Sequence, residues 1–166
     1  FGVPFDGTSS FKPGSRFAPN AMREDSWGLE SYSPYLNKDL EDLKLFDYGN
    51  LEVPFGDKKN ALRQITAFVQ EVIDDNKIPL MLGGEHLLTL APIKALAKKH
   101  EDLHLIHFDA HTDLRQEYLG ESLSHATVIR RVHDILGDGK INQFCIRSGL
   151  KEEFEWAKEH TNLEKF

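Results

Sequence analysis

The chain has 166 residues, of which 40% are hydrophobic and 28% are charged, and its formal net charge is −7 at pH 7. This length suits a single domain with a hydrophobic core, and this composition excludes an intrinsically disordered chain. The acidic balance disfavours nucleic acid as a partner, because a polyphosphate is bound by a basic face, and it suits a small cationic substrate.

The first 55 residues contain few regular patterns. Residues 6–19 are rich in Gly, Pro, Ser and Thr and predict a long loop, and a loop of this length in a compact domain is typically functional. Pro19 can begin a helix that runs to Leu29, because proline suits the first helical position. Residues 30–42 give no clear pattern, whereas residues 43–48 predict a strand.

From residue 57 onward, helical and strand patterns alternate. Apolar residues at helical spacing predict helices, and short apolar runs predict strands. The predicted helices span residues 57–76, 86–99, 124–136 and 151–160, and the predicted strands span residues 78–82, 103–108 and 140–146. Repeated strand-helix-strand units need long crossovers, so we expect an α/β fold with a mostly parallel sheet and helices on both faces.

Two of these strands end in polar residues. His86 follows the first of them after Gly-Gly-Glu, and the second is followed by Asp109, His111 and Asp113 at alternate positions. Ligands of open parallel sheets bind at the carboxyl ends of the strands. Alternate side chains of an extended backbone point the same way, so these three residues are expected to converge, together with His86.

Two carboxylates and two imidazoles in a small volume are costly on their own and favourable around a divalent cation. Oxygen-rich ligation with imidazole and without thiolate favours Mn²⁺, with Fe, Co or Zn as substitutes, and two ions would generate hydroxide near neutral pH. An isolated Asp-x-His is commonly an ion pair. The triplet Asp109, His111 and Asp113, backed by His86, favours a metal centre instead.

The other histidines support weaker hypotheses. His107 lies on the same alternation but precedes the strand end, so it is predicted to be a satisfied core residue. His125 follows Ser124, a candidate helix cap, and could donate a proton to a leaving amine or be an ordinary residue of the helix start. The remaining histidines are predicted to lie on the surface: His100, His104, His133 and His160.

Cys145 is the single cysteine of the chain. It excludes an internal disulfide and indicates a reducing, cytoplasmic compartment. Its place in an apolar strand predicts a buried, inert thiol rather than a nucleophile. No apolar run is long enough to span a membrane.

These motifs resemble the ureohydrolase family, which includes arginases, agmatinases, guanidinobutyrases and formimidoylglutamases. The resemblance runs along essentially the whole chain. Its most specific parts are Gly83-Gly84-Glu85-His86 and Asp109-Ala110-His111-Thr112-Asp113, supported by Gly2-Val3-Pro4-Phe5-Asp6 and Pro13-Gly14-Ser15-Arg16-Phe17. The stretch from Leu114 to Thr127 is more similar to bacterial agmatinases than to arginases. Lys12, Ala18 and Ala126 depart from the family's frequent residues.

The resemblance implies an arginase-like three-layer αβα fold, with residues 1–166 as a single domain that is incomplete at its C-terminal end. It implies two Mn²⁺ ions, with His86 on one, His111 on the other, Asp109 bridging both and Asp113 completing the first ion's ligands. Further ligands would come from an Asp-x-Asp motif beyond residue 166. His125 would shuttle protons or meet the substrate.

The activity that the resemblance implies is hydrolysis of agmatine to putrescine and urea by a homo-oligomer, trimeric or hexameric. Two alternatives stay open at this point. One is another guanidino or formimino substrate, such as arginine, guanidinobutyrate or formimidoylglutamate. The other is a metal-binding protein without turnover. The chain opens directly into an apolar segment without an initiating Met, so we expect a piece of a longer protein that is inactive by itself.

Overall fold

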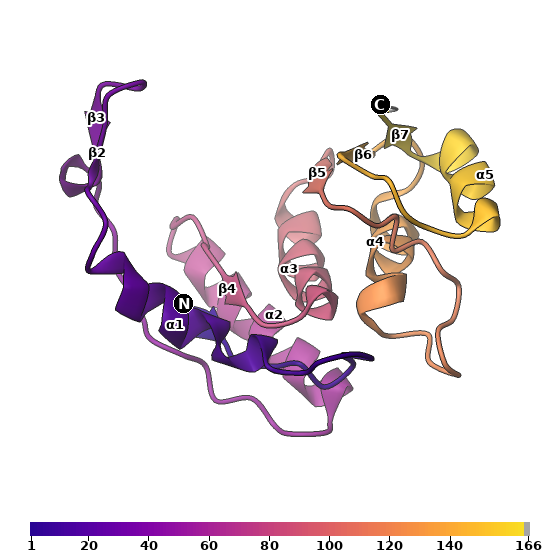
Figure 1. The fold of residues 1–166 in the computed structure, drawn as a ribbon, viewed down its shortest axis with the longest axis horizontal. Coiled ribbons are helices and arrows are strands. Elements are labelled where there is room, and N and C mark those ends of the chain that lie inside the picture. Colours follow the sequence, from indigo (N-terminus) through magenta and orange to yellow (C-terminus); the bar gives the residue numbers. More distant parts are fainter. Residues whose placement is uncertain (165–166) are drawn as a thin grey trace.

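A computed structural model describes residues 1–164, which form helices and short strands (Figure 1). β1 (Gly2–Val3) pairs in parallel with β4 (Leu82–Gly83). A second parallel sheet has the order β5-β6-β7 and contains β5 (Leu105–Phe108), β6 (Ile141–Phe144) and β7 (Asn162–Leu163). The expected α/β class with parallel strands is therefore confirmed.

The only antiparallel pair of strands in the described residues projects away from the rest of the molecule in Figure 1. It consists of β2 (Tyr32–Ser33) and β3 (Lys38–Asp39), within residues 30–42, for which no element was predicted. Tyr35, in its turn, has an exposed fraction of 98%. This hairpin contributes nothing to the buried core.

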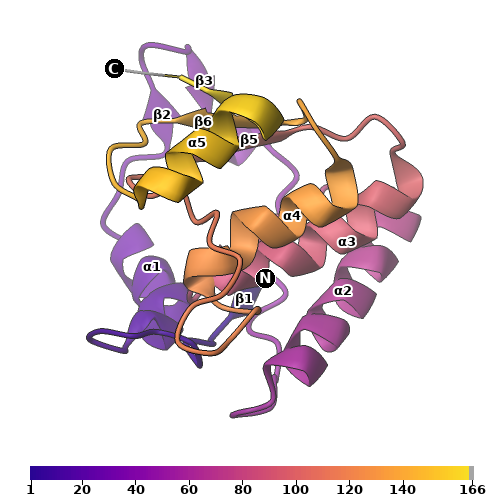
Figure 2. The same cartoon turned by 90° about the vertical axis from the view of Figure 1, so that its right-hand side faces the viewer.

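The α-helices of the described residues are α1 (Ala18–Ser26), α2 (Lys58–Asp74), α3 (Leu90–Lys99), α4 (Val128–Leu136) and α5 (Lys151–His160). Three of them pack in a row, α2 against α3 and α3 against α4, as Figure 2 shows. The Asp57 side chain begins α2 by accepting a hydrogen bond from the Asn60 amide. Within the described residues, no helix is long and apolar enough to cross a membrane.

Short 3-10 turns precede several helices and place polar residues at their starts. The turns are η1 (Ser15–Phe17), η2 (Leu40–Asp42), η3 (His86–Thr89) and η4 (His125–Thr127). η3 leads directly into α3 and η4 into α4, so the helical predictions for residues 86–99 and 124–136 are confirmed with a tighter first turn.

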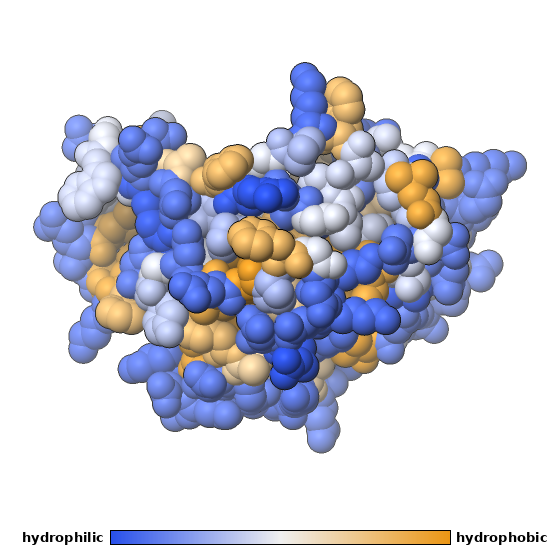
Figure 3. Space-filling model, turned by 90° about the horizontal axis from the view of Figure 1, so that it is seen from below, coloured by the Kyte–Doolittle hydropathy of each residue, from blue (hydrophilic) through white to orange (hydrophobic). Residues whose placement is uncertain are grey.

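The hydrophobic core lies between α2, α3, α4 and the strands. Its largest fully buried apolar side chains are Ile65, Leu87, Leu88, Leu90, Leu114, Ile129 and Ile141. Apolar residues of α2 recur every three or four positions, so one face of this helix is buried against α3. On the face shown in Figure 3, hydrophilic side chains surround separate hydrophobic patches.

Two strand predictions were wrong in extent. Residues 43–48 form no strand, and the nearest pairing is a single bridge between Gly2 and Asn50. Residues 78–81 lie outside any strand, and Ile78 has an exposed fraction of 94%, whereas Leu82, the last residue of that prediction, pairs with Gly2 in β4. An apolar run becomes a buried strand only where a neighbouring strand and a packing layer meet it along its length.

The prediction of a buried Cys145 was also wrong. Cys145 follows β6 with a positive φ of 67° and is exposed. The positive φ at Cys145 ends the strand at Phe144, two residues before the predicted end, so the alternation that buries Ile141 and Gln143 does not continue to Cys145.

Candidate metal centre

A close crossing of two backbone segments positions His86. The Gly84 amide donates to Val3 O (3.2 Å), and the Glu85 amide donates to Phe5 O (2.9 Å). A Cβ atom on Gly84 would lie 1.9 Å from Phe5 O, which no rotamer change could relieve. Glycine at position 84 is therefore required so that His86 can begin η3 beside the end of β5.

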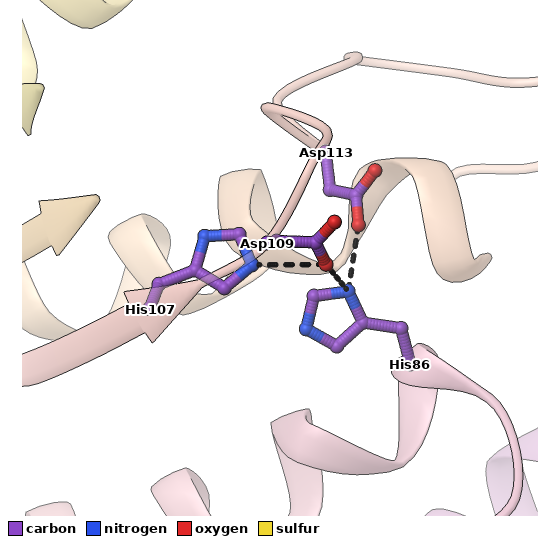
Figure 4. Close-up of side chains that lie close together, drawn as sticks. All are labelled: His86, His107, Asp109 and Asp113. Carbon is purple, nitrogen blue, oxygen red and sulfur yellow. Dashed lines mark hydrogen bonds and ion pairs between the residues drawn. The ribbon is translucent and has the colours of Figure 1, made fainter. Parts of the chain in front are cut away.

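His86, Asp109 and Asp113 converge at this point, as Figure 4 shows. His86 Nδ1 lies 2.6 Å from Asp113 Oδ2 and 3.5 Å from Asp109 Oδ2. The three side chains are partly buried, with exposed fractions of 23%, 26% and 12% for His86, Asp109 and Asp113. The predicted convergence of these three residues is present in the structure.

Asp113 reaches the cluster by a different backbone path from the predicted one. Its φ is 51°, so the chain leaves the extended conformation before Asp113. The Ile129 and Arg130 amides both donate to Asp113 O, at 3.1 and 3.3 Å, and hold this turn against the start of α4. Simple alternation from Asp109 to Asp113 was thus wrong, although the carboxylate ends where it was expected.

His111 lies on the other side of Asp109. Its Nδ1 is 3.4 Å from Asp109 Oδ1, while His86 faces Oδ2. The His111 amide also donates to Oδ1, at 2.9 Å. The two oxygens of Asp109 therefore face two different imidazoles, which is the orientation that a bridging carboxylate needs. With an exposed fraction of 63%, the His111 side chain is the most open of the four.

His107 joins the same cluster from inside the sheet, with its ring stacked on His86 at a centroid distance of 5.1 Å. Its Nδ1 accepts a hydrogen bond from Gln143 Nε2 (3.1 Å), and its Nε2 lies 3.3 Å from Asp109 Oδ2. Gln143 Nε2 also donates to Thr112 O (3.0 Å), which fixes the orientation of the amide. His107 therefore carries its proton on Nε2 and donates it to Asp109.

In this tautomer His107 cannot bind a metal ion through Nε2, because a metal ligand needs a free lone pair on the nitrogen that faces the ion. The prediction of a buried, satisfied histidine is confirmed, with an exposed fraction of 6%. Its contact with Asp109 was not predicted. A signal was present in Gln143, a polar residue on the same alternation as the buried Ile141.

Burial and the neighbouring imidazoles shift the pKa of Asp109 in opposite directions. Burial alone would raise the pKa of Asp109, but the His111 amide and the His86 and His107 rings bring that pKa below its ordinary value. Burial lowers the pKa of His107, as does its proximity to His86. The carboxylate is thus held ionised beside a neutral donor.

No Lys or Arg among the described residues pairs with Asp109 or Asp113. Arg115, the nearest cation in the cleft, instead lies 3.6 Å from Glu153 Oε2. Ligand atoms of His86, His107, Asp109 and Asp113 lie within 4.8 Å of one another. Two carboxylates with imidazole neighbours and no fixed countercharge fit a divalent cation.

Glu153, a residue that the sequence did not single out, fixes the loop that carries Asp109 and Asp113. Its Oε1 accepts from Thr112 Oγ1 (2.7 Å) and from the Leu114 amide (3.0 Å), and its Oε2 accepts from the Leu150 amide (2.8 Å). Glu153 is buried, with an exposed fraction of 6%. A glutamate three residues into a predicted helix was the available signal, because such a residue often caps the helix start.

His125 lines the same cleft, which has a volume of about 550 Å³ and is also lined by His86, Asp109, His111 and Asp113. Its Nδ1 donates to Thr8 O (2.9 Å), so its Nε2 is the atom left for other partners, and Ser10 Oγ lies 3.4 Å from it. Thr127 Oγ1 accepts from the Ser124 amide (2.9 Å), so the predicted cap at this helix start is confirmed.

Glu85 and Thr8 hold His125 in place, and neither was predicted. The Thr8 amide donates to Glu85 Oε1 (2.6 Å), and the Thr8 hydroxyl donates to Glu85 Oε2. The same hydroxyl accepts from the His125 amide, at 3.1 Å. Glu85 is 7% exposed. The long loop of residues 6–19 thus contacts His125, a residue that lines the cleft.

The arrangement can bind cations and move protons. Asp109 and Asp113 supply charge, His86 and His111 supply nitrogen lone pairs on either side of Asp109, and His125 presents a nitrogen to the same cleft. Clustered carboxylates and imidazoles at the carboxyl ends of parallel strands are typical of metal-dependent hydrolases.

Comparisons with known proteins agree with this class. The model of the arginase family matches residues 1–164. An agmatinase of Bacillus cereus is 54% identical over 167 aligned residues, covering 100% of this chain and 58% of that protein, and an agmatinase of Bacillus subtilis is 51% identical with the same coverage. The crystal structure of a putative agmatinase from Clostridium difficile has a TM-score of 0.95 and 53% identity, covering 98% of this chain and 60% of that one.

The chain belongs to the arginase family. Its fold is that of the arginases and agmatinases, and it spans less than two thirds of the length of the relatives that it matches.

Proposed function

We propose that the protein carrying this chain is a binuclear manganese hydrolase that cleaves agmatine to putrescine and urea. The observation that carries the proposal is Asp109, whose Oδ2 faces His86 and whose Oδ1 faces His111. The relatives named agmatinase at 54% and 51% identity support the substrate. The net charge of −7 is in keeping with a cationic substrate.

In this proposal His86, Asp109 and Asp113 hold one ion, and His111 and Asp109 hold the other. Bound ions there would supply Lewis acidity and lower the pKa of water. His107 would keep Asp109 oriented by donating from Nε2 to Oδ2, a contact of 3.3 Å.

The reaction adds water across one C–N bond of the guanidinium group. The water oxygen bonds to the guanidinium carbon, the bond from that carbon to the alkyl nitrogen breaks, and the departing amine takes a proton. His125 would take up at Nε2 a proton released by the attacking water and pass it to the amine, because its Nδ1 is engaged by Thr8 O at 2.9 Å. Its contacts with Thr8 hold the ring in that orientation.

The test of the metal-dependent activity is Asp109→Asn in the complete gene product. The amide is isosteric but cannot bridge two cations, so Mn²⁺-dependent urea release should fall to background. Asp75→Asn, at the end of α2, is the control and should keep full activity. Unchanged turnover of Asp109→Asn would refute the proposal.

The substrate needs a separate measurement. Urea release from agmatine, arginine and guanidinobutyrate, and formamide release from formimidoylglutamate, would be compared at equal enzyme concentration. Agmatine should give the highest kcat/KM. A higher value for another substrate would correct the substrate while leaving the hydrolase class intact, and no turnover of any would favour a metal-binding protein without activity.

We further propose that residues 1–164 are part of one ureohydrolase domain, that the protein is cytoplasmic and that it forms a homo-oligomer, trimeric or hexameric. The single cysteine, which is exposed, is in keeping with a reducing compartment. Light scattering of the complete protein after size-exclusion chromatography tests the oligomer, and a monomeric mass would contradict it.

A further inference from the structure

A second group of metal-type side chains lies at the C-terminal ends of α4 and α5. His133 Nε2 lies 2.7 Å from Asp138 Oδ1, and His160 Nδ1 lies 2.6 Å from the same oxygen. Ligand atoms of the three residues all lie within 4.8 Å of one another. This group shares no residue with the cluster at the ends of β4 and β5. His133 and His160 are partly exposed, in keeping with the expected surface position, but the partner that they share was not predicted.

The backbone brings the three residues together firmly. The Gly137 amide donates to His133 O (2.9 Å), and the Gly139 amide donates to His160 O (3.0 Å). Gly137 and Gly139 have φ values of 83° and 73°, a region that favours glycine. The turn that carries Asp138 is thus tied to the ends of both helices.

Aromatic packing orients the two imidazoles. The ring of Trp156 stacks on His160 at a centroid distance of 4.2 Å, and the His133 ring meets Trp156 edge-on at 4.7 Å. Arg130 Cζ lies 3.9 Å from the centroid of the Trp156 ring. Exposed fractions of 17% for His133 and 29% for His160 contrast with 67% for Asp138, so the group opens to solvent on its carboxylate side.

Two imidazole nitrogens and one carboxylate oxygen are a donor set of Zn²⁺ and other late first-row metals. Metal-ligand distances of about 2.0–2.2 Å place the ligand atoms of a tetrahedral site about 3.4 Å apart. The present contacts of 2.6 and 2.7 Å are shorter, so a cation requires the exposed Asp138 side chain to withdraw by less than an ångström or so. His133 and His160 donate hydrogen bonds to Asp138 Oδ1 from the nitrogens that would face the ion, so a bound cation takes the place of these two protons.

We propose that His133, Asp138 and His160 bind one Zn²⁺ ion or a similar late first-row divalent cation, at a site separate from the one built around Asp109. Solvent water completes the coordination, because three protein ligands leave a position open. The bound cation links the ends of α4 and α5 through the turn of Asp138. This site does not depend on the proposed activity.

The test counts metal ions in the complete protein. Metal-free protein is dialysed against Zn²⁺, and bound zinc per chain is measured by elemental analysis. The double variant His133→Gln/His160→Gln should bind one ion fewer per chain than the unaltered protein. The double variant His100→Gln/His104→Gln is the matched control, because both residues are exposed, and it should bind the same number. Equal counts for all three proteins would overturn the proposal.

A second variant and a spectroscopic readout guard against misfolding of the double variant. Asp138→Asn changes an exposed side chain and should weaken zinc binding at this site at least tenfold. Cu²⁺ bound beside Trp156 should also quench the fluorescence of this residue. The part of the quenching that is lost in the Trp156→Phe variant is the part that comes from Trp156. Saturable quenching that His160→Gln removes and Asp109→Asn preserves supports the site. Quenching that survives His160→Gln and Asp138→Asn contradicts it.

Discussion

Thr8 makes two contacts with His125, one through its hydroxyl (3.1 Å to the His125 amide) and one through its carbonyl (2.9 Å to Nδ1). Its hydroxyl also donates to the buried Glu85. Thr8→Val removes the hydroxyl and leaves Glu85 without one of its donors, so we expect the position of His125 to loosen. In the complete enzyme kcat should fall by about tenfold while bound manganese is unchanged.

Thr8→Ser restores the hydroxyl and should restore most of the activity. The measurements are steady-state urea release and manganese content of both variants. If Thr8→Val keeps the kcat of the unaltered enzyme, His125 is not held through this hydroxyl.

Single residues differ in how far the sequence predicts them. His86, Asp109 and Asp113 were predictable because the ends of parallel strands converge, whatever the path of the loop between them. Gln143, Glu153 and Thr8 were not, because their partners are far away in the chain: Gln143 contacts Thr112, and Thr8 contacts Glu85. Such contacts depend on tertiary packing that a linear pattern does not contain.

At the scale of elements, the crossing of the β1 and β4 ends predicts that alanine substitutions at two neighbouring glycines differ in their cost to stability. A Cβ on Gly84 would meet Phe5 O at 1.9 Å, whereas the nearest atom to a Cβ on Gly83 is Leu88 Cδ1 at 3.7 Å. Gly84→Ala should lower the free energy of unfolding by about 3 kcal/mol, and Gly83→Ala by less than about 1 kcal/mol. Urea unfolding followed by circular dichroism measures both, and equal effects would show that the crossing tolerates a side chain.

The loop of residues 6–16 gives a pH-dependent prediction. Arg16 and the Gly14 amide hold the pKa of Asp6 below its ordinary value of 3.8. A carboxyl group with a lowered pKa in the folded state binds fewer protons than in the unfolded state. Its contribution to stability is therefore present above pH 3.8 and is lost as the pH falls through the lowered value.

Asp6→Asn should accordingly be less stable than the unaltered protein at pH 7, and the difference should shrink as the pH falls below about 4. Arg16→Gln removes the same ion pair and should show the same trend. Urea midpoints at pH 7, 5 and 3 provide the comparison. A difference that stays constant down to pH 3 would exclude this carboxylate as its source.

Helices were predicted better than strands for a physical reason. Residues 57–76 carry their own signals, an apolar period and the Asp57 cap, and α2 spans Lys58–Asp74. Residues 43–48 and 78–81 carry only apolar character, and strand pairing depends on a partner elsewhere in the chain. The same dependence explains Cys145, where a local turn overrides the alternation.

At the scale of the whole molecule, the proposed metal centre brings together residues from two strand ends. His86 follows β4, whereas Asp109 and Asp113 follow β5, so a cation held by all three would join the ends of these two strands. Manganese should therefore raise the thermal midpoint of the protein, because a ligand that binds only the folded state stabilises it.

At a free manganese concentration one hundred times the dissociation constant, binding stabilises the folded state by about 2.7 kcal/mol. Differential scanning calorimetry of metal-free and manganese-loaded protein measures the shift, and Asp109→Asn should remove most of it. A midpoint that does not respond to manganese would contradict a manganese site in the folded protein.

A chain of hydrogen bonds through Gln143 connects Thr161 with the proposed metal centre. Thr161 Oγ1 donates to Gln143 Oε1 (3.2 Å), Gln143 Nε2 donates to His107 Nδ1 (3.1 Å), and His107 faces Asp109. A methyl group in place of the Thr161 hydroxyl would remove one of the contacts that orient the Gln143 amide, so its orientation would then depend on the contact with Thr112 O. Position 161, remote from the cleft and outside every recognised motif of the chain, therefore helps to orient the hydrogen that His107 directs at Asp109.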